Sequence, residues 1–125
     1  MWRNMTRESA GVVAVVDDDH AVLDSLKFLL EVVGYRVVTY ASARAFLDNR
    51  GSVPSCLIID HHMPVMTGLE LAQKLREEKS DIPILLITGA PSPAIVIRAA
   101  ELGIERVLEK PPDEDDLLAF VNKHL

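Results

Sequence analysis

Three short runs of apolar residues stand out along the chain: Val12 to Val16, Cys56 to Ile59 and Ile82 to Ile87. Each run is bounded by polar or turn-forming residues, which is typical of strands buried on both faces of a parallel sheet. Two weaker runs, Tyr35 to Tyr40 and Ile104 to Glu109, complete a set of five predicted strands. The spacing between successive runs leaves room for a helix after each strand.

The intervening segments carry helix signals. The first has an apolar stripe at helical spacing and then a glycine as a C-terminal stop. Its stripe consists of Val22, Leu26, Leu29 and Val33, and the stop is Gly34. Each later segment begins with a residue suited to cap a helix N-terminus. These caps are Ser42, Thr67 (with Glu70 completing a capping box), Ser92 (followed by Pro93) and Asp113. Five strand–helix units in succession predict an α/β fold with a parallel sheet, right-handed crossovers and helices on both faces.

Polar residues follow the predicted strands in an informative way. Asp17, Asp18 and Asp19 end the first strand, and Asp60 ends the third. Thr88 and Lys110 come at the ends of the fourth and fifth strands. Ligands of open α/β sheets bind beyond the carboxyl ends of the strands, so we expect several of these side chains to share one edge.

A cluster of carboxylates at that edge requires a cation. Two carboxylates about 4 Å apart repel by about 4 kcal/mol at an effective dielectric constant of about 20. Oxygen ligands without cysteine or a clear histidine cage favour a hard divalent ion, above all Mg²⁺. Such an ion can bridge a carboxylate and an incoming phosphoryl group, while Thr88 and Lys110 contact the phosphoryl oxygens. The pattern predicts phosphoryl transfer to a carboxylate.

Composition narrows the class of protein. The 125 residues suit one domain, and 49% hydrophobic with 26% charged residues is typical of a globular protein. The formal net charge of −6 argues against direct nucleic-acid binding. No apolar run approaches the ~20 residues of a membrane span. Residues 1–10 lack the apolar centre of a signal peptide, so we expect a disordered or frayed leader, a domain over 11–125, and a cytoplasmic location.

Four segments resemble the receiver domains of bacterial response regulators, the CheY-like family. They are VVDDDHAVLDSL, LIIDHHMPVMTGLEL, ILLITG and VLEKP. The resemblance extends from Gly11 onward, and it includes the 28-residue separation of Asp60 from Thr88 and the 22-residue separation of Thr88 from Lys110. It implies a doubly wound (βα)5 fold, flavodoxin-like, with strand order 2-1-3-4-5. Within the family the sequence is most similar to FixJ-type and NarL-type transcription regulators.

The resemblance also implies residue roles. Asp60 would accept the phosphoryl group, Thr88 would be the switch hydroxyl, and Lys110 would bind the phosphoryl group, with a cis peptide bond to the following proline. Mg²⁺ would be held by Asp18 and Asp60, by Asp17 mostly through water, and by the backbone carbonyl of His62.

The same resemblance implies partners and an output. A histidine kinase or phosphotransfer protein would donate the phosphoryl group, and the domain would be no enzyme beyond catalysing its own aspartyl phosphorylation and dephosphorylation. The output surface would comprise the fourth helix, fifth strand and fifth helix, with a homodimer forming through the fourth helix and fifth strand. The FixJ-like character favours a native chain that continues beyond Leu125 into a DNA-binding domain, although a stand-alone regulator is the other form.

Four positions depart from the family pattern. Val107 replaces the aromatic switch residue, Pro112 replaces a residue that is often Phe, and His62 and Ala90 flank the phosphoryl position. A branched valine has few χ1 options, so ring rotation cannot amplify the switch and we expect only a modest shift of the fourth helix.

Two other functions are compatible with part of this pattern. A haloacid-dehalogenase-type phosphatase would use Asp17 as nucleophile with Asp19, Thr88 and Lys110, but it leaves Asp60 without a role. A pseudo-receiver would keep the fold as an interaction module without phosphorylation. Asp19 fits a helix cap better than a metal ligand, and the adjacent side chains of His61 and His62 are expected to diverge.

Overall fold

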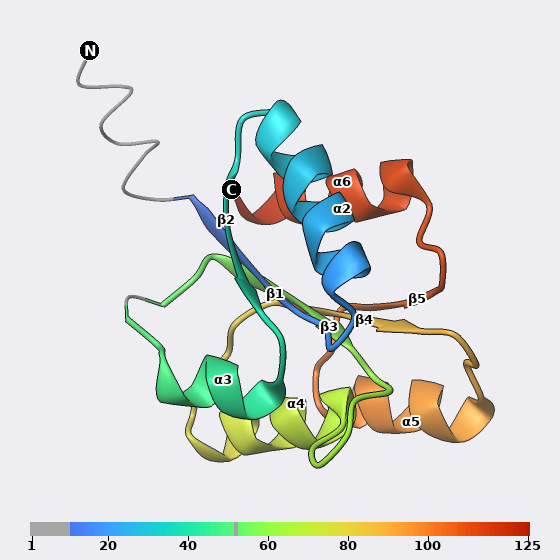
Figure 1. Cartoon of the computed structure of the whole chain (residues 1–125). Helices are drawn as coiled ribbons and strands as arrows, with labels where there is room; N and C mark the ends of the chain where they lie inside the picture. Colours follow the sequence, from blue (N-terminus) through green and yellow to red (C-terminus); the bar gives the residue numbers. More distant parts are fainter. Residues whose placement is uncertain (1–10, 52) are drawn as a thin grey trace.

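The computed structural model describes residues 11–51 and 53–125, in which a parallel sheet separates two layers of helices (Figure 1). The expected leader over residues 1–10 lies outside the described residues. The strands are β1 (Val12–Val16), β2 (Arg36–Tyr40), β3 (Cys56–Asp60), β4 (Ile84–Thr88) and β5 (Arg106–Glu109). The helices are α2 (His20–Val32), α3 (Ala43–Asp48), α4 (Gly68–Glu77), α5 (Pro93–Glu101) and α6 (Glu114–His124). The strand order β2-β1-β3-β4-β5, with parallel pairing throughout, confirms the predicted topology.

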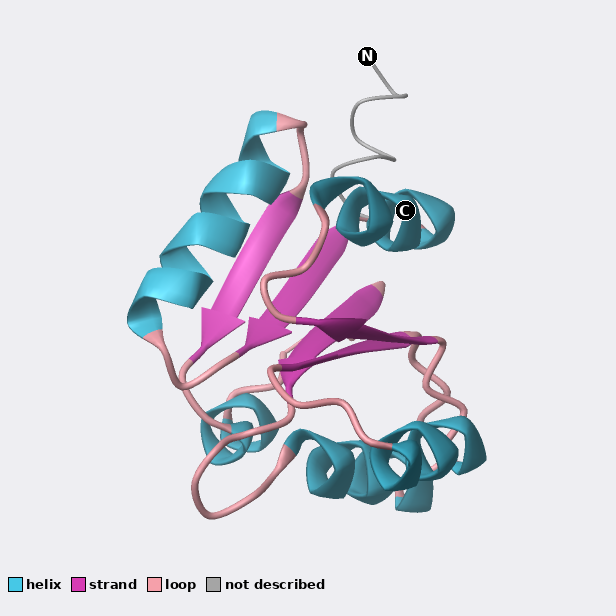
Figure 2. Ribbon diagram, turned by 90° about the vertical axis from the view of Figure 1, so that its right-hand side faces the viewer, coloured by secondary structure: helices cyan, strands magenta, loops and turns pink. Residues whose placement is uncertain are grey.

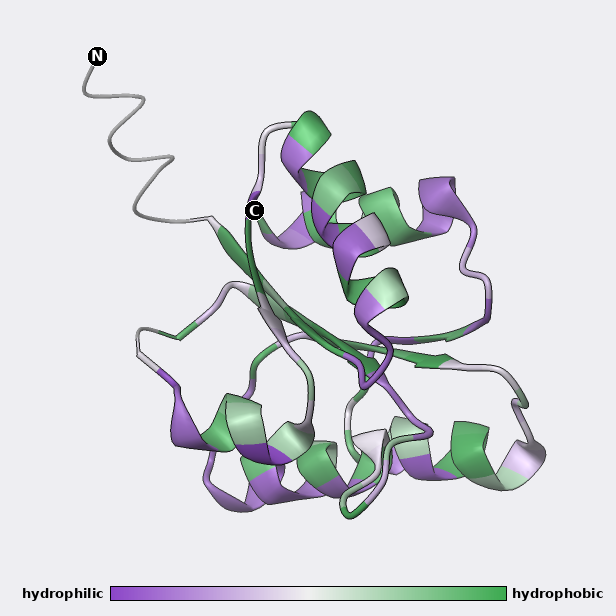
Figure 3. Ribbon diagram, viewed as in Figure 1, coloured by the Kyte–Doolittle hydropathy of each residue, from purple (hydrophilic) through white to green (hydrophobic). Residues whose placement is uncertain are grey.

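The sheet has a core on each face because successive strand residues point to opposite sides. Helices α2 and α6 cover one face, and α3, α4 and α5 cover the other (Figures 1 and 2). Along β1, Val13 and Val15 belong to the first core, whereas Ala14 and Val16 belong to the second. The central strands β3 and β4 are buried along their length and apolar up to their last residue (Figure 3), which explains why the sequence shows continuous apolar runs there.

The helix starts follow the predicted caps. The side chains of Asp19, Ser42, Thr67, Ser92 and Asp113 each accept a hydrogen bond from a backbone amide in the first turn of their helix. The predicted capping box at the start of α4 is also confirmed, and it fixes this helix directly after the loop that leaves β3.

The core-facing stripe of α2 differs from the predicted one. The buried residues are Leu23, Leu26 and Leu30. Val33 is 49% exposed, so its predicted place in the core is wrong. The helix has more apolar residues than one face can bury (Figure 3). Phe28, Val32 and Val33, which fall outside the buried stripe, are left exposed.

Two strands are shorter than their apolar runs. The strand β4 begins at Ile84, although Ile82 is buried, because the segment before it contains Pro83, whose carbonyl accepts from Leu57 but which has no amide to donate. Ile104 is buried before β5 begins, and its amide donates to the carbonyl of Ala99 at the end of α5. Over the described residues, no helix combines the length and apolarity needed to cross a membrane.

Candidate functional site

Four predicted site residues meet at the carboxyl edge of the sheet. Asp17 directly follows β1, Asp60 and Thr88 are the last residues of β3 and β4, and Lys110 directly follows β5. Asp17, Asp60 and Thr88 are at most 3% exposed, whereas the other buried side chains in the described part of the chain are apolar. The parallel register therefore brings together the residues that the sequence places 93 positions apart, from Asp17 to Lys110.

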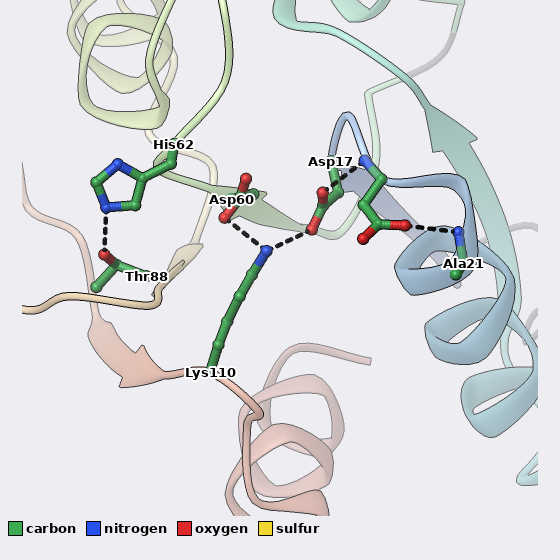
Figure 4. Close-up of polar contacts among 7 residues, drawn as sticks. Asp17, Ala21, Asp60, His62, Thr88 and Lys110 are labelled. Atoms are coloured by element: carbon green, nitrogen blue, oxygen red, sulfur yellow. Dashed lines mark hydrogen bonds and ion pairs between the residues drawn. The ribbon is translucent and has the colours of Figure 1, made fainter.

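The ammonium group of Lys110 bridges two of the carboxylates (Figure 4). Its Nζ lies 2.9 Å from Oδ1 of Asp60 and 3.2 Å from Oδ2 of Asp17. The predicted cis peptide bond between Lys110 and Pro111 is present, and the amide of Lys110 donates to the carbonyl of Thr88. The hydrogen bond from its amide ties the backbone of Lys110 to the end of β4, and its side chain points toward the aspartates.

Burial and charge shift two pKa values in this cluster. Desolvation, with a further contribution from the charge of Asp60, raises the pKa of Asp17, although the amide of Asp19 and the ammonium of Lys110 oppose it. Desolvation also acts on Lys110, but the carboxylates of Asp60 and Asp17 outweigh it and raise the pKa of the ammonium. Lys110 is therefore held in its charged form at neutral pH.

The carboxylates fit a divalent cation. One oxygen from each of Asp17, Asp18 and Asp60 lies within 4.8 Å of the others. Oδ1 of Asp60 is buried, and its partner among the described residues is the ammonium group of Lys110. Three carboxylates and one ammonium leave two negative charges, which one hard divalent ion would balance. Asp19 instead caps α2, as predicted, because its Oδ1 accepts from the amide of Ala21 at 2.9 Å (Figure 4).

A glycine holds the loop after β3 close to the backbone of Asp60. A Cβ atom at Gly68 would lie 2.7 Å from the carbonyl oxygen of Asp60 and 2.7 Å from Cδ1 of Leu86. The amide of Gly68 donates to the carbonyl of His61 at 3.0 Å. The start of α4 therefore lies against the backbone of Asp60, and only a glycine fits there.

The hydroxyl of Thr88 has two hydrogen-bond partners among the described residues. Oγ1 lies 3.1 Å from Nε2 of His62, and it accepts from the amide of Ala90 at 3.2 Å (Figure 4). The rings of His61 and His62 contact each other edge to face with centroids 4.9 Å apart, so the expectation that they diverge is wrong. Both histidines lie in the loop after β3, where side chains no longer alternate between the two faces as they do along a strand.

The sequence interpretation did not foresee an apolar groove next to the site. It lies between α2 and the segment that joins β5 to α6, and Lys110 lines it together with Val22, Phe28, Leu29, Pro111 and Pro112. Phe28 is 72% exposed. An aromatic residue that falls outside the buried stripe of an amphipathic helix was the signal in the sequence for this surface.

Comparison with known proteins gives consistent matches. The family model described as "Response regulator receiver domain" matches residues 13–122. The response regulator protein TmoT of Ectopseudomonas mendocina is 37% identical over 100% of the chain and 57% of its own length. The transcriptional regulatory protein FixJ of Bradyrhizobium diazoefficiens is 38% identical over 89% of the chain and 55% of its own length.

The fold has equally clear counterparts. A CheY-like receiver domain protein from Methanospirillum hungatei superimposes with a TM-score of 0.84 at 29% identity, covering 90% of this chain and 91% of that one. The chain spans about half the length of the curated relatives it matches.

Proposed function

The chain belongs to the family of response regulator receiver domains, and we propose that it accepts a phosphoryl group on Asp60 in a Mg²⁺-dependent reaction. As a receiver domain it is a signalling module rather than a classical enzyme. The phosphoryl donor would be a histidine kinase or a phosphotransfer protein, which are the partners of this family.

The environment of Asp60 is the observation that carries this proposal. The carboxylate is 3% exposed, has Lys110 at 2.9 Å, and shares an acidic cluster with Asp17 and Asp18. A buried carboxylate that terminates a central strand and shares one ammonium group with two further carboxylates is incompletely neutralised by the folded chain alone. The carboxylate of Asp60 is therefore well placed to act as a nucleophile, in a site whose negative charge a bound cation would balance.

The proposed step moves one phosphoryl group between two side chains. A carboxylate oxygen of Asp60 attacks the phosphorus, the phosphorus–nitrogen bond of the donor's phosphohistidine breaks, and the donor nitrogen keeps the electron pair. Lys110, held as a cation, would neutralise charge on the phosphoryl oxygens, and Thr88 would donate its hydroxyl proton to one of them. Water then releases phosphate from Asp60 and resets the domain.

Asp17, Asp18, Asp60 and the backbone carbonyl of His62 would hold Mg²⁺. The donor set is composed of oxygen atoms, which suits this ion. When bound, Mg²⁺ supplies charge neutralisation for the carboxylates and for the phosphoryl oxygens.

The donor would dock on the apolar groove between α2 and the β5–α6 segment. Lys110 lines this groove and also contacts Asp60, so a protein helix seated there can present a phosphohistidine to the carboxylate. The exposed ring of Phe28 offers an apolar anchor for such a helix.

The output surface would be formed by α5, β5 and α6. Val96 and Ile97 on α5 are 49% and 61% exposed, which supports a homodimer through α5 and β5 after phosphorylation. Val107 is half-buried beneath α5 and cannot swing as an aromatic ring does, so we expect a modest shift of α5. In a longer regulator this change would control an attached DNA-binding domain.

Phosphorylation by a small-molecule donor tests the proposal. Wild-type protein incubated with acetyl phosphate and Mg²⁺ should gain one phosphoryl group in its intact mass, whereas Asp60→Asn should gain none. Asp48→Asn is the matched control, because Asp48 ends α3 on the exposed surface away from the site. Labelling of Asp60→Asn at the wild-type level would contradict the proposal.

The same assay separates the two other readings. A phosphatase of the haloacid-dehalogenase type would lose labelling in Asp17→Asn and keep it in Asp60→Asn. That class of enzyme also needs a later acidic pair at the end of a strand, whereas Asp115 and Asp116 lie in the first turn of α6. The pseudo-receiver reading predicts no labelling of the wild type.

A further inference from the structure

His62 contacts the proposed switch residue directly. Nε2 of His62 lies 3.1 Å from Oγ1 of Thr88, and the two side chains come from different segments, the loop after β3 and the end of β4 (Figure 4). Thr88 is fully buried, whereas His62 is exposed at the rim of the site. Nothing in the proposed transfer to Asp60 requires this hydrogen bond.

The position of the hydroxyl proton follows from the partners of Thr88. The amide of Ala90 is a donor, so Oγ1 accepts there with a lone pair. The hydroxyl has a single proton to donate, and Nε2 of His62 is the hydrogen-bond partner among the described residues that can accept it. A buried hydroxyl proton without an acceptor is costly, which favours the His62 tautomer that carries its proton on Nδ1 and accepts from the hydroxyl at Nε2.

This arrangement makes His62 a competitor of the phosphoryl group. A phosphoryl oxygen on Asp60 would need the same hydroxyl proton that His62 accepts in the structure. We propose that His62 is a positioning residue that holds Thr88 in its unphosphorylated orientation, so that switching requires the His62–Thr88 hydrogen bond to break. The inference rests on the proposed function, since it presupposes a phosphoryl group on Asp60.

Removing the acceptor should therefore favour the phosphorylated-like state. In His62→Leu the proton of the Thr88 hydroxyl has lost its acceptor in the free protein and regains one only when the phosphoryl analogue is bound. Beryllofluoride with Mg²⁺, titrated by calorimetry, should bind His62→Leu about fivefold more tightly than wild type, which corresponds to about 1 kcal/mol for one hydrogen bond. His62→Gln, whose amide oxygen can accept the same proton, should bind close to the wild-type affinity.

A double-mutant cycle shows whether the effect passes through the hydroxyl. In a Thr88→Val background the hydroxyl is gone, so His62→Leu should no longer tighten beryllofluoride binding. If the role of His62 were purely structural, His62→Leu would instead lower the free energy of unfolding without raising the affinity for beryllofluoride. The imidazole nitrogens give a second readout, because the NMR signal of Nε2 should report an unprotonated acceptor that loses its hydrogen bond when beryllofluoride binds.

The outcomes separate this inference from the proposed function. Weaker binding by His62→Leu, or equal tightening with and without the Thr88 hydroxyl, would overturn the role of His62 while leaving phosphorylation at Asp60 in place. Failure of the wild type to bind beryllofluoride with Mg²⁺ would overturn both.

Discussion

Replacing Gly68 by alanine should damage the fold and the site together. The added methyl group would lie 2.7 Å from the carbonyl oxygen of Asp60, 2.7 Å from Cδ1 of Leu86 and 3.0 Å from Cα of His61. Carbon atoms in contact prefer separations of about 3.5–4.0 Å, so the start of α4 must move away from β3. Overpacking of this kind costs about 1–3 kcal/mol, and the better helix propensity of alanine offsets at most about 1 kcal/mol. We expect the free energy of unfolding to fall by about 1–2 kcal/mol.

The movement also displaces the backbone of the proposed nucleophile. A misplacement of about 1 Å can cost about 100-fold in rate, so Gly68→Ala should slow labelling by acetyl phosphate by about tenfold or more. Urea denaturation measures the loss of stability, and the initial rate of labelling, followed by intact mass, measures the loss of reactivity. Gly89→Ala is the matched control: Gly89 directly follows Thr88, but a Cβ atom there has no neighbour within 4 Å. Wild-type stability and labelling in Gly68→Ala, or equal damage in Gly89→Ala, would refute the reasoning.

Three further predictions concern the cation, the donor and the buried thiol. Saturating Mg²⁺ should raise the melting temperature of the wild type and much less that of Asp18→Ala, because ligand binding stabilises the folded state through the acidic cluster; identical shifts would remove Asp18 from the ligands. Phe28→Ser should slow phosphotransfer from a phosphorylated histidine kinase but leave labelling by acetyl phosphate unchanged, and slowing of both would place Phe28 outside a docking surface. Burial, assisted by the charge of Glu105, raises the pKa of Cys56 from 9.0 to about 12. The folded state keeps this proton longer than the unfolded state, so the free energy of unfolding should fall between about pH 9 and pH 12, by at most about 4 kcal/mol, and Cys56→Ala should lose this component in alkaline urea titrations.

Much of the site could be predicted because the backbone of a parallel sheet determines it. Apolar runs that end in Asp17, Asp60 and Thr88 place these residues at one edge of the sheet. Lys110 lies at the same edge because it directly follows the last strand. The helix caps could be predicted for a similar reason, since each depends on side chains within one turn.

The features that the sequence did not reveal depend on tertiary placement of single side chains. The bond between His62 and Thr88 requires a particular rotamer of a loop residue, for which a one-dimensional pattern has no signal. The groove at Phe28 arises because α2 is rotated so that Leu23 and Leu30 face the core. This rotation could not be predicted from the sequence, because α2 has apolar residues on more than one face.

Chemical identification of the phosphorylated residue tests the central claim most directly. An aspartyl phosphate can be trapped by borohydride, which reduces the acyl phosphate to homoserine, and the modified position can then be read by peptide mass spectrometry. After incubation with a phosphorylated histidine kinase and Mg²⁺, we expect homoserine at position 60 and at no other aspartate. Homoserine at position 17, or trapping that does not depend on Mg²⁺, would contradict the account.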